Sequence, residues 1–270
     1  MDTDSTAGHR DAAVAEQETL RGLLARPEPP DTTLAYGPAA DHVVDVFRPT
    51  ALPRRALLLL HGGYWRRAVD RTHATPLARE LARRGHLVLV PEYRRGSGAC
   101  PATLEDMELL SARLPRLLER AGHPETAPDL PLTVAGHSAG GHLALWWGIS
   151  GLGHGAGPVP RIRALAPVAD LTRGAREGIG EGAVVDFMGG TPEELPEAYA
   201  HADPAARWPE APADRRRTVR ALHGDRDRRV PVEHTTDSPV ESVIVRGAHH
   251  FDVVDPASAH WPAVLEFLET

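Results

Sequence analysis

One serine of the sequence lies in a pattern that could make it a nucleophile. Ser138 is the centre of Gly136-His137-Ser138-Ala139-Gly140, which matches G-x-S-x-G. The strand-like run LTVAG precedes it, and the helix-prone run AGGHLALWWG follows it. In that setting a tight strand-to-helix turn exposes the serine hydroxyl, and the glycines let neighbouring backbone approach. The pattern predicts attack by Ser138 on a carbonyl, with the start of the helix favouring the negative charge that develops.

An earlier glycine pair could bind the oxyanion of such a reaction. The apolar run ALLLL is followed by HGGYW at 61–65. Loops of this HGG type present backbone N–H groups to a tetrahedral oxyanion. We expect the donors to be the amides of Gly63 and Tyr64, together with the amide of Ala139. The rings of Tyr64 and Trp65 are expected to contact the substrate, because they follow the glycines directly. Packing of these rings into the core beneath a cap is the alternative.

Two neighbouring aspartates compete for the role of the catalytic acid. With a serine of this kind, the order along the chain is serine, acid, histidine. The sequence GDRDRRVP at 224–231 contains Asp225 and Asp227. We favour Asp227, which lies on the loop, whereas Asp225 is better placed to shape the turn through bonds to the backbone. Asp170 is a third candidate, although capping of the segment that follows it is the stronger interpretation.

The base is expected near the end of the chain. His249 and His250 follow the last predicted strand, and a catalytic base must reach the serine from a loop near the sheet edge. We favour His250 and keep His249 as the alternative. The other histidines show no H-E-x-x-H or comparable ligand spacing. We therefore expect no metal and no cofactor.

The order of apolar and helix-prone segments predicts the framework for these residues. From residue 56 onward the two kinds of segment alternate, which indicates an α/β fold with a mostly parallel sheet and helices on both faces. Such sheets bind ligands at the carboxyl ends of their strands, where all the motifs above fall. The expected strands are 42–47, 56–61, 87–91, 132–136, 162–168, 218–223 and 242–246. The main expected helices are 12–25, 73–84, 102–121, 139–150 and 257–269.

The chain of 270 residues is expected to form one domain, 1–270. Residues 1–30 form an N-terminal extension that contains the short helix at 12–25. Residues 170–210 interrupt the alternation and are rich in Gly, Pro and acidic residues. We expect them to form a small cap over the site, because long insertions in compact domains are often lids. A surface insertion without function is the alternative.

The composition excludes several kinds of chemistry and partner. The sequence contains arginine but no lysine, so a Schiff-base lysine and a Ser-Lys dyad are excluded. The net charge of −7 argues against a nucleic-acid partner. Cys100 is the one cysteine and cannot form a disulfide within the chain, which favours a cytoplasmic location. The sequence shows no apolar core of a signal peptide and no run long enough for a membrane span.

With these motifs in this order, the chain resembles the α/β-hydrolase superfamily from about residue 40 to the end. Its motifs are also similar to those of kynurenine formamidases and related small esterases. That resemblance implies the α/β-hydrolase fold and a triad of Ser138, Asp227 and His250. It further implies cleavage of N-formyl-kynurenine to kynurenine and formate. The motifs that carry it are HGGYWR (61–66), PEYRRG (91–96), GHSAGGHLA (136–144), HGDRDRRVP (223–231) and HFDVVDP (250–256).

The chain departs from that family in two places. The segment from Pro231 to His250 is short for a helical connection, so the crossover between the last two strands must be abbreviated. The residue before the expected base is His249, where glycine is common. Within PEYRRG we expect a structural role, in which Arg94 ties the following loop to a carboxylate such as Asp106.

These observations predict acyl transfer in two steps on a small ester or amide substrate. An arylformamidase is the first expectation. A general short-chain carboxylesterase is the alternative, although such enzymes often carry HGGG where this chain has Tyr64. A hydrolase-like binding protein and an acyltransferase are further alternatives. The sequence leaves the oligomeric state open, a homodimer included.

Overall fold

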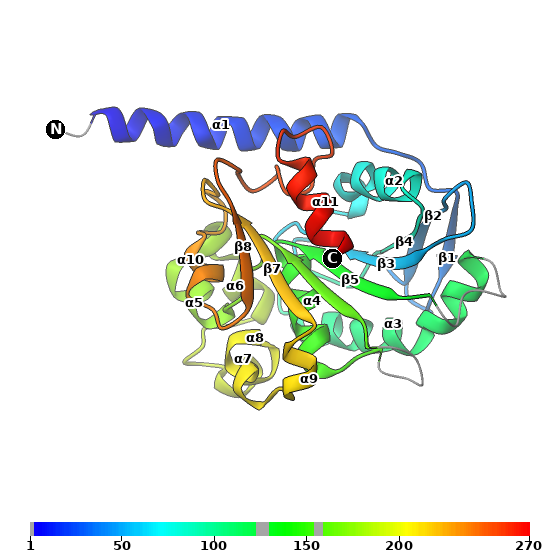
Figure 1. Ribbon diagram of the computed structural model, residues 1–270. Helices are drawn as coiled ribbons and strands as arrows, with labels where there is room; N and C mark the ends of the chain where they lie inside the picture. The colour runs from blue at the N-terminus through cyan, green and yellow to red at the C-terminus, as the bar shows by residue number, and fades with distance from the viewer. Residues whose placement is uncertain (1–2, 123–129, 154–158) are drawn as a thin grey trace.

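The computed structural model describes residues 3–122, 130–153 and 159–270, so residues 1–2 of the expected N-terminal extension lie outside it. Within these ranges the strands form one sheet in the order β1-β2-β4-β3-β5-β6-β7-β8 (Figure 1). β1 and β4 pair antiparallel with β2, and all other neighbours pair parallel. The strands are β1 Thr32–Ala35, β2 Val43–Phe47, β3 Arg55–Leu60, β4 His86–Pro91, β5 Leu132–His137, β6 Arg161–Leu165, β7 Val219–Gly224 and β8 Glu241–Val245.

Helices cover both faces of this sheet, as the apolar runs require. The larger helices are α1 Thr3–Ala25, α2 Thr75–Arg83, α3 Cys100–Ala121, α4 Ala139–Ser150 and α11 Trp261–Glu269. Leu58 and Leu60 of β3 pack into one hydrophobic cluster with α3 and α4, whereas Leu57 and Leu59 pack into another with α2 and α11. Alternate residues of a strand point to opposite faces, so a continuous apolar run fits a strand that is buried on both.

The segment expected as a cap is helical. It contains α5 Leu171–Glu177, α6 Ile179–Met188, α7 Pro196–Ala202, α8 Pro204–Arg207 and the short 3-10 helix Trp208–Glu210. Its helices lie on the α4 side of the sheet, where α8 packs against α4 (Figure 1). Asp170 accepts a hydrogen bond from the Arg173 amide at 2.7 Å and caps α5, which confirms the capping interpretation of Asp170.

The observed elements differ from the expected ones in two places near the start of the chain. β1 was not predicted, and α1 begins at Thr3 rather than at residue 12. The connection from β7 to β8 contains a four-residue helix, α10 Glu233–Thr236, which confirms the abbreviated crossover. No helix in the described part of the chain is both long and apolar enough to cross a membrane.

Candidate active site

Ser138 occupies a strained turn between β5 and α4. Its φ of 56° and ψ of −117° are unusual for a residue with a side chain, and such strain concentrates at functional sites. The turn is held by a bond from its own amide to the Leu165 carbonyl at 2.9 Å. A side chain at Gly136 would overlap the carbonyl of Gly140, and one at Gly140 would overlap that of Leu60. Both glycines of the motif are therefore required by close backbone approach.

The loop after β7 and the loop after β8 bring an acid and a histidine together. His250 Nδ1 lies 2.6 Å from Asp227 Oδ2. The other oxygen of Asp227 accepts from the amides of Arg229 and Val230, each at 2.9 Å. Burial opposes ionisation, but the charge of His250 and hydrogen bonds from His223 and His250 outweigh it and hold the Asp227 pKa well below its usual range. The structure thus presents an ionised carboxylate to His250 Nδ1.

A second histidine, which was not predicted from the sequence, contacts the same carboxylate. His223 Nε2 lies 3.0 Å from Asp227 Oδ2 and 3.0 Å from the Val230 carbonyl. Because a carbonyl only accepts, this nitrogen donates, and Nδ1 is left to face the Thr235 hydroxyl at 2.7 Å. The signal was present in HGDRD, where a histidine closes a buried strand just before the acid.

The competing candidates lie elsewhere. Asp225 accepts a hydrogen bond from the Gly247 amide at 2.7 Å and joins two turns. His249 Nε2 lies 3.3 Å from the Thr19 hydroxyl, and its Nδ1 lies 3.2 Å from a carboxylate oxygen of Asp252. The structure therefore brings Asp227 and His250 together, and it brings neither alternative to that contact.

Ser138 and His250 line one cavity of about 140 Å³. No hydrogen bond joins the Ser138 hydroxyl to His250 among the described residues. Catalytic hydrogen bonds often tighten only when a substrate binds. The cavity is bounded by Leu20, Gly63, Tyr64, Arg66, Val69, His73, His137, Ser138, Arg229, His250 and Phe251.

The HGG loop, which begins with residues 61–63, packs directly against Ser138. A side chain at Gly62 would lie 3.1 Å from Ser138 Cβ. Gly63 and Tyr64 have φ values of 119° and 54°, and their amides find no acceptor within the described residues. Ala139 is the first residue of α4, where an amide has no partner inside the helix. All three expected oxyanion donors are thus unengaged in the neighbourhood of Ser138.

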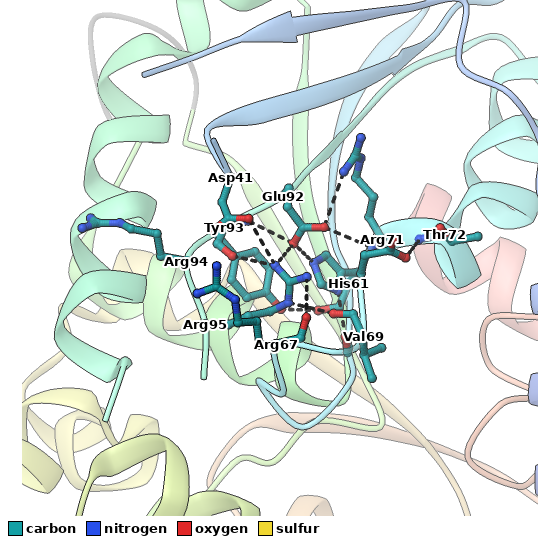
Figure 2. A network of polar contacts seen from close by, with 12 residues as sticks. Asp41, His61, Arg67, Val69, Arg71, Thr72, Glu92, Tyr93, Arg94 and Arg95 are labelled. Carbon is teal, nitrogen blue, oxygen red and sulfur yellow. Dashed lines mark hydrogen bonds and ion pairs between the residues drawn. The ribbon is translucent and has the colours of Figure 1, made fainter. Parts of the chain in front are cut away.

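A buried network fixes the HGG loop (Figure 2). Glu92, at the end of β4, lies 2.8 Å from His61 Nε2 and also pairs with Arg71 and Arg95. The Arg95 Nε donates to the Val69 carbonyl at 2.7 Å, so both ends of the loop are held. Burial raises the Glu92 pKa, but the hydrogen bond and charge of His61 and the charge of Arg95 outweigh this effect and lower it. This confirms the structural role expected within PEYRRG, although the contact of Glu92 with His61 was not predicted.

The neighbouring Arg94 makes the contact with Asp106 that was expected from the sequence. Its Nε lies 2.8 Å from Asp106 Oδ1, and its amide donates to Asp106 Oδ2 at 2.7 Å. This confirms the structural interpretation of Arg94.

Of the two rings expected against the substrate, the structure places one at the cavity. Tyr64 lines it and donates from its hydroxyl to the Arg229 carbonyl at 3.1 Å. Trp65 is 1% exposed and stacks on Phe187 of α6, with ring centroids 4.6 Å apart. The expectation for Trp65 as a substrate contact is therefore corrected. Phe187 provides an apolar partner for this ring, which agrees with the alternative of core packing.

Three further histidines near the site are buried and uncharged. His137 donates from Nε2 to the His250 carbonyl at 2.9 Å. Burial, together with the charges of His250 and His73, lowers the His137 pKa well below its usual range. Burial likewise lowers the pKa of His73 and of His142 to about 4. All three imidazole rings are therefore uncharged at physiological pH and serve only as hydrogen-bond donors or acceptors.

These histidines predict a loss of stability on mild acidification. Their folded pKa values lie below the unfolded value of about 6.5, so the unfolded chain binds more protons as the pH falls. Each histidine should remove about 1.4 kcal/mol per pH unit once the unfolded chain is protonated. We expect the thermal unfolding midpoint to fall steeply between about pH 6 and pH 4. His142→Gln, which keeps a donor toward the Ala202 carbonyl, should flatten this slope. A midpoint independent of pH over this range would contradict the prediction.

Among the described residues, no group of three or more His, Cys, Asp or Glu side chains is arranged to hold a metal ion.

A search of curated proteins found no match to this sequence. A family model described as alpha/beta hydrolase fold matches residues 57–184, which include the HGG loop and Ser138.

Solved structures similar to this chain span most of its length. A putative thioesterase from Silicibacter sp. TM1040 is 23% identical, with a TM-score of 0.64, and covers 97% of this chain and 92% of its own. Esterase B from Lactobacillus rhamnosis is 16% identical (TM-score 0.66, 97% and 90% covered). A hyperthermophilic esterase from the archaeon Pyrobaculum calidifontis is 20% identical (TM-score 0.61, 100% and 93% covered). The family match, the sheet order and these likenesses together show that the chain has the α/β-hydrolase fold.

Proposed function

We propose that this protein is a serine esterase that forms an acyl-enzyme on Ser138. The observation that carries the proposal is the buried 2.6 Å contact between Asp227 and His250 Nδ1, beside a serine in a strained turn of the same cavity. With Nδ1 donating to Asp227, Nε2 of His250 is the nitrogen that can accept a proton.

The proposed reaction follows from these positions. Ser138 Oγ attacks the acyl carbon while His250 Nε2 takes its proton, and Asp227 stabilises the imidazolium that forms. The oxyanion accepts from the amides of Gly63, Tyr64 and Ala139. His250 then returns the proton to the leaving group and activates a water molecule, which hydrolyses the acyl-enzyme.

The names of the similar structures support an ester or thioester substrate for this chain. Two of them are esterases and one is a putative thioesterase. Another, from Caldicellulosiruptor lactoaceticus, is an acetyl ester-xyloside bifunctional hydrolase, 18% identical with a TM-score of 0.62 over 88% of this chain. We therefore propose a carboxylic ester of a small molecule as the general substrate.

We propose a small acyl group, formyl or acetyl, as the finer preference. The cavity beside Ser138 holds about 140 Å³ and is bounded by Tyr64 and by Leu20 of α1, which leaves little space for a long chain. Arg66 also lines it and is 44% exposed. Its Nη2 donates to the Gly180 carbonyl at 2.6 Å and lies 3.5 Å from a carboxylate oxygen of Glu181, and the remaining N–H groups could bind a carboxylate on the leaving group. N-formyl-kynurenine has both features and is the first amide to test, beside simple esters.

Acyl-chain length should separate a small-acyl enzyme from a lipase-like one. We expect kcat/KM for p-nitrophenyl esters to fall by about tenfold or more between acetyl and octanoyl, because the added methylenes do not fit. Leu20→Ala should widen the cavity and shift the preference toward longer acyl groups. Leu24→Ala is the matched control, since Leu24 lies on the same helix and is 47% exposed. A value of kcat/KM that rises with acyl-chain length would overturn the small-acyl proposal. Failure to cleave N-formyl-kynurenine would exclude this amide as a substrate.

A further inference from the structure

The N-terminal helix carries a buried carboxylate into the neighbourhood of the site. α1 runs along the α2 and α11 side of the molecule and passes the loops that follow β7 and β8 (Figure 1). Glu16 lies in the middle of this helix and is 2% exposed. Glutamate is almost never fully buried unless its charge is paired or hydrogen-bonded. Its partners therefore indicate why it is there.

Those partners belong to the two loops that present the acid and the histidine. Glu16 Oε1 accepts from the Arg228 amide at 2.7 Å and lies 3.5 Å from the His250 amide. Its other oxygen lies 3.6 Å from the Arg229 Nε. Arg228 directly follows Asp227 in the chain. A single carboxylate oxygen thus joins the backbone beside the acid to the backbone of the histidine.

We propose that Glu16 is a positioning residue for the Asp227–His250 pair, an inference that rests on the serine esterase function proposed above. It acts through the two backbone amides and is not among the residues that line the cavity. By fixing both loops to one rigid helix, it limits the separation of Asp227 from His250. A displacement of about 1 Å in such a group can cost about 10²-fold in rate.

Anchoring of α1 to the body of the protein is a separate task with its own contacts. Leu23 is fully buried in the cluster that contains α2 and α11, and Arg26 pairs with Asp255 at 3.2 Å. Leu23 packs in the core away from both loops, and Arg26 reaches the loop after β8 at Asp255, five residues beyond His250. Glu16 differs from these anchors because its hydrogen-bond partners are the backbone amides next to Asp227 and at His250.

Three variants test the proposal. Glu16→Ala removes the acceptor and leaves two amides unpaired. Glu16→Gln keeps an oxygen that can accept from both amides. Glu18→Ala is the matched control, because Glu18 is an exposed glutamate of the same helix. We expect the maximal rate of reaction with a fluorophosphonate to fall about 10- to 100-fold in Glu16→Ala, with its half-saturating concentration unchanged. Glu16→Gln should restore most of the rate, and Glu18→Ala should equal the parent protein.

Hydrogen exchange provides a readout that needs no turnover. In Glu16→Ala, peptides that cover 225–230 and 247–252 should both exchange faster than in the parent protein, whereas Glu16→Gln should protect them. Unchanged exchange in both loops, or faster exchange confined to α1, would overturn the proposal and leave Glu16 as an anchor. A parent protein that does not react with fluorophosphonate would overturn the esterase function instead, and the exchange result alone would then decide the role of Glu16 in holding the two loops.

Discussion

Ser138→Ala is expected to abolish labelling by fluorophosphonate and to lower turnover of an ester substrate by about 10⁴- to 10⁶-fold. The reagent phosphonylates an activated serine hydroxyl, and the variant removes that oxygen while it leaves the oxyanion amides in place. The remaining rate should come from substrate binding and those amides alone. Intact-mass spectrometry after labelling and initial-rate kinetics measure the two effects.

The folded state should tolerate this change. Alanine keeps the Cβ and requires the same strained backbone, with φ at 56°. The Ser138 hydroxyl makes no hydrogen bond within the described residues, so its loss leaves no buried partner unpaired. We expect the thermal midpoint to stay close to that of the parent protein. Ser97→Ala, at an exposed position, is the matched control and should label fully. Undiminished labelling of Ser138→Ala would exclude Ser138 as the nucleophile.

The sheet could be predicted because most of its strands are short, continuous apolar segments of the sequence. Runs such as ALLLL and LVLV have apolar residues at every position, which suits strands covered on both faces. Glycine, proline and short polar segments separate these runs from the helices. The edge strand β1, with the sequence TTLA, has only four residues of alternating exposure. So short a pattern is not distinguishable from a loop.

Residues of the candidate site could be predicted where they belong to a sequence motif. They could not be predicted where their role depends on contacts between residues that are far apart in the sequence. Ser138, Asp227 and His250 stand in recognisable patterns at the ends of predicted strands. Glu16 lies 212 positions from Arg228 and 234 from His250 in the chain, so no local pattern connects them. For Trp65 the sequence left two outcomes open, contact with the substrate and packing into the core, and the ring stacks on Phe187 of α6 in the core. Packing of this kind depends on tertiary structure, not on spacing.

Asp227→Asn should cost catalysis of the order of 10⁴-fold, the effect expected when the triad acid loses control of the histidine tautomer. The backbone decides how the new amide is oriented. Asp227 Oδ1 accepts from the amides of Arg229 and Val230, so the asparagine oxygen must take that position. Its NH₂ group then faces His250 Nδ1. That nitrogen must become the acceptor, Nε2 carries the proton, and His250 can no longer take one from Ser138.

The same substitution should also lower the stability of the fold. The NH₂ group would face His223 Nε2, which donates to the Asp227 carboxylate and to the Val230 carbonyl in the parent protein. Two donors would then oppose each other in a buried site, at a cost of about 1–3 kcal/mol. Thermal unfolding should therefore show a lower midpoint for Asp227→Asn, and kinetics must be measured well below it.

Asp225→Asn provides the matched control for this prediction. It changes the same residue type two positions earlier, where the side chain is exposed and accepts from the Gly247 amide. An asparagine oxygen can accept that hydrogen bond equally well, so activity and stability should both stay close to those of the parent protein. The pair of variants thus differs in the contact with His250, which only Asp227 makes. Equal losses of kcat/KM in the two variants would contradict the assignment of Asp227 as the acid. A full loss confined to Asp227→Asn, with labelling of Ser138 slowed to the same degree, would show that the acid acts through His250 on the serine.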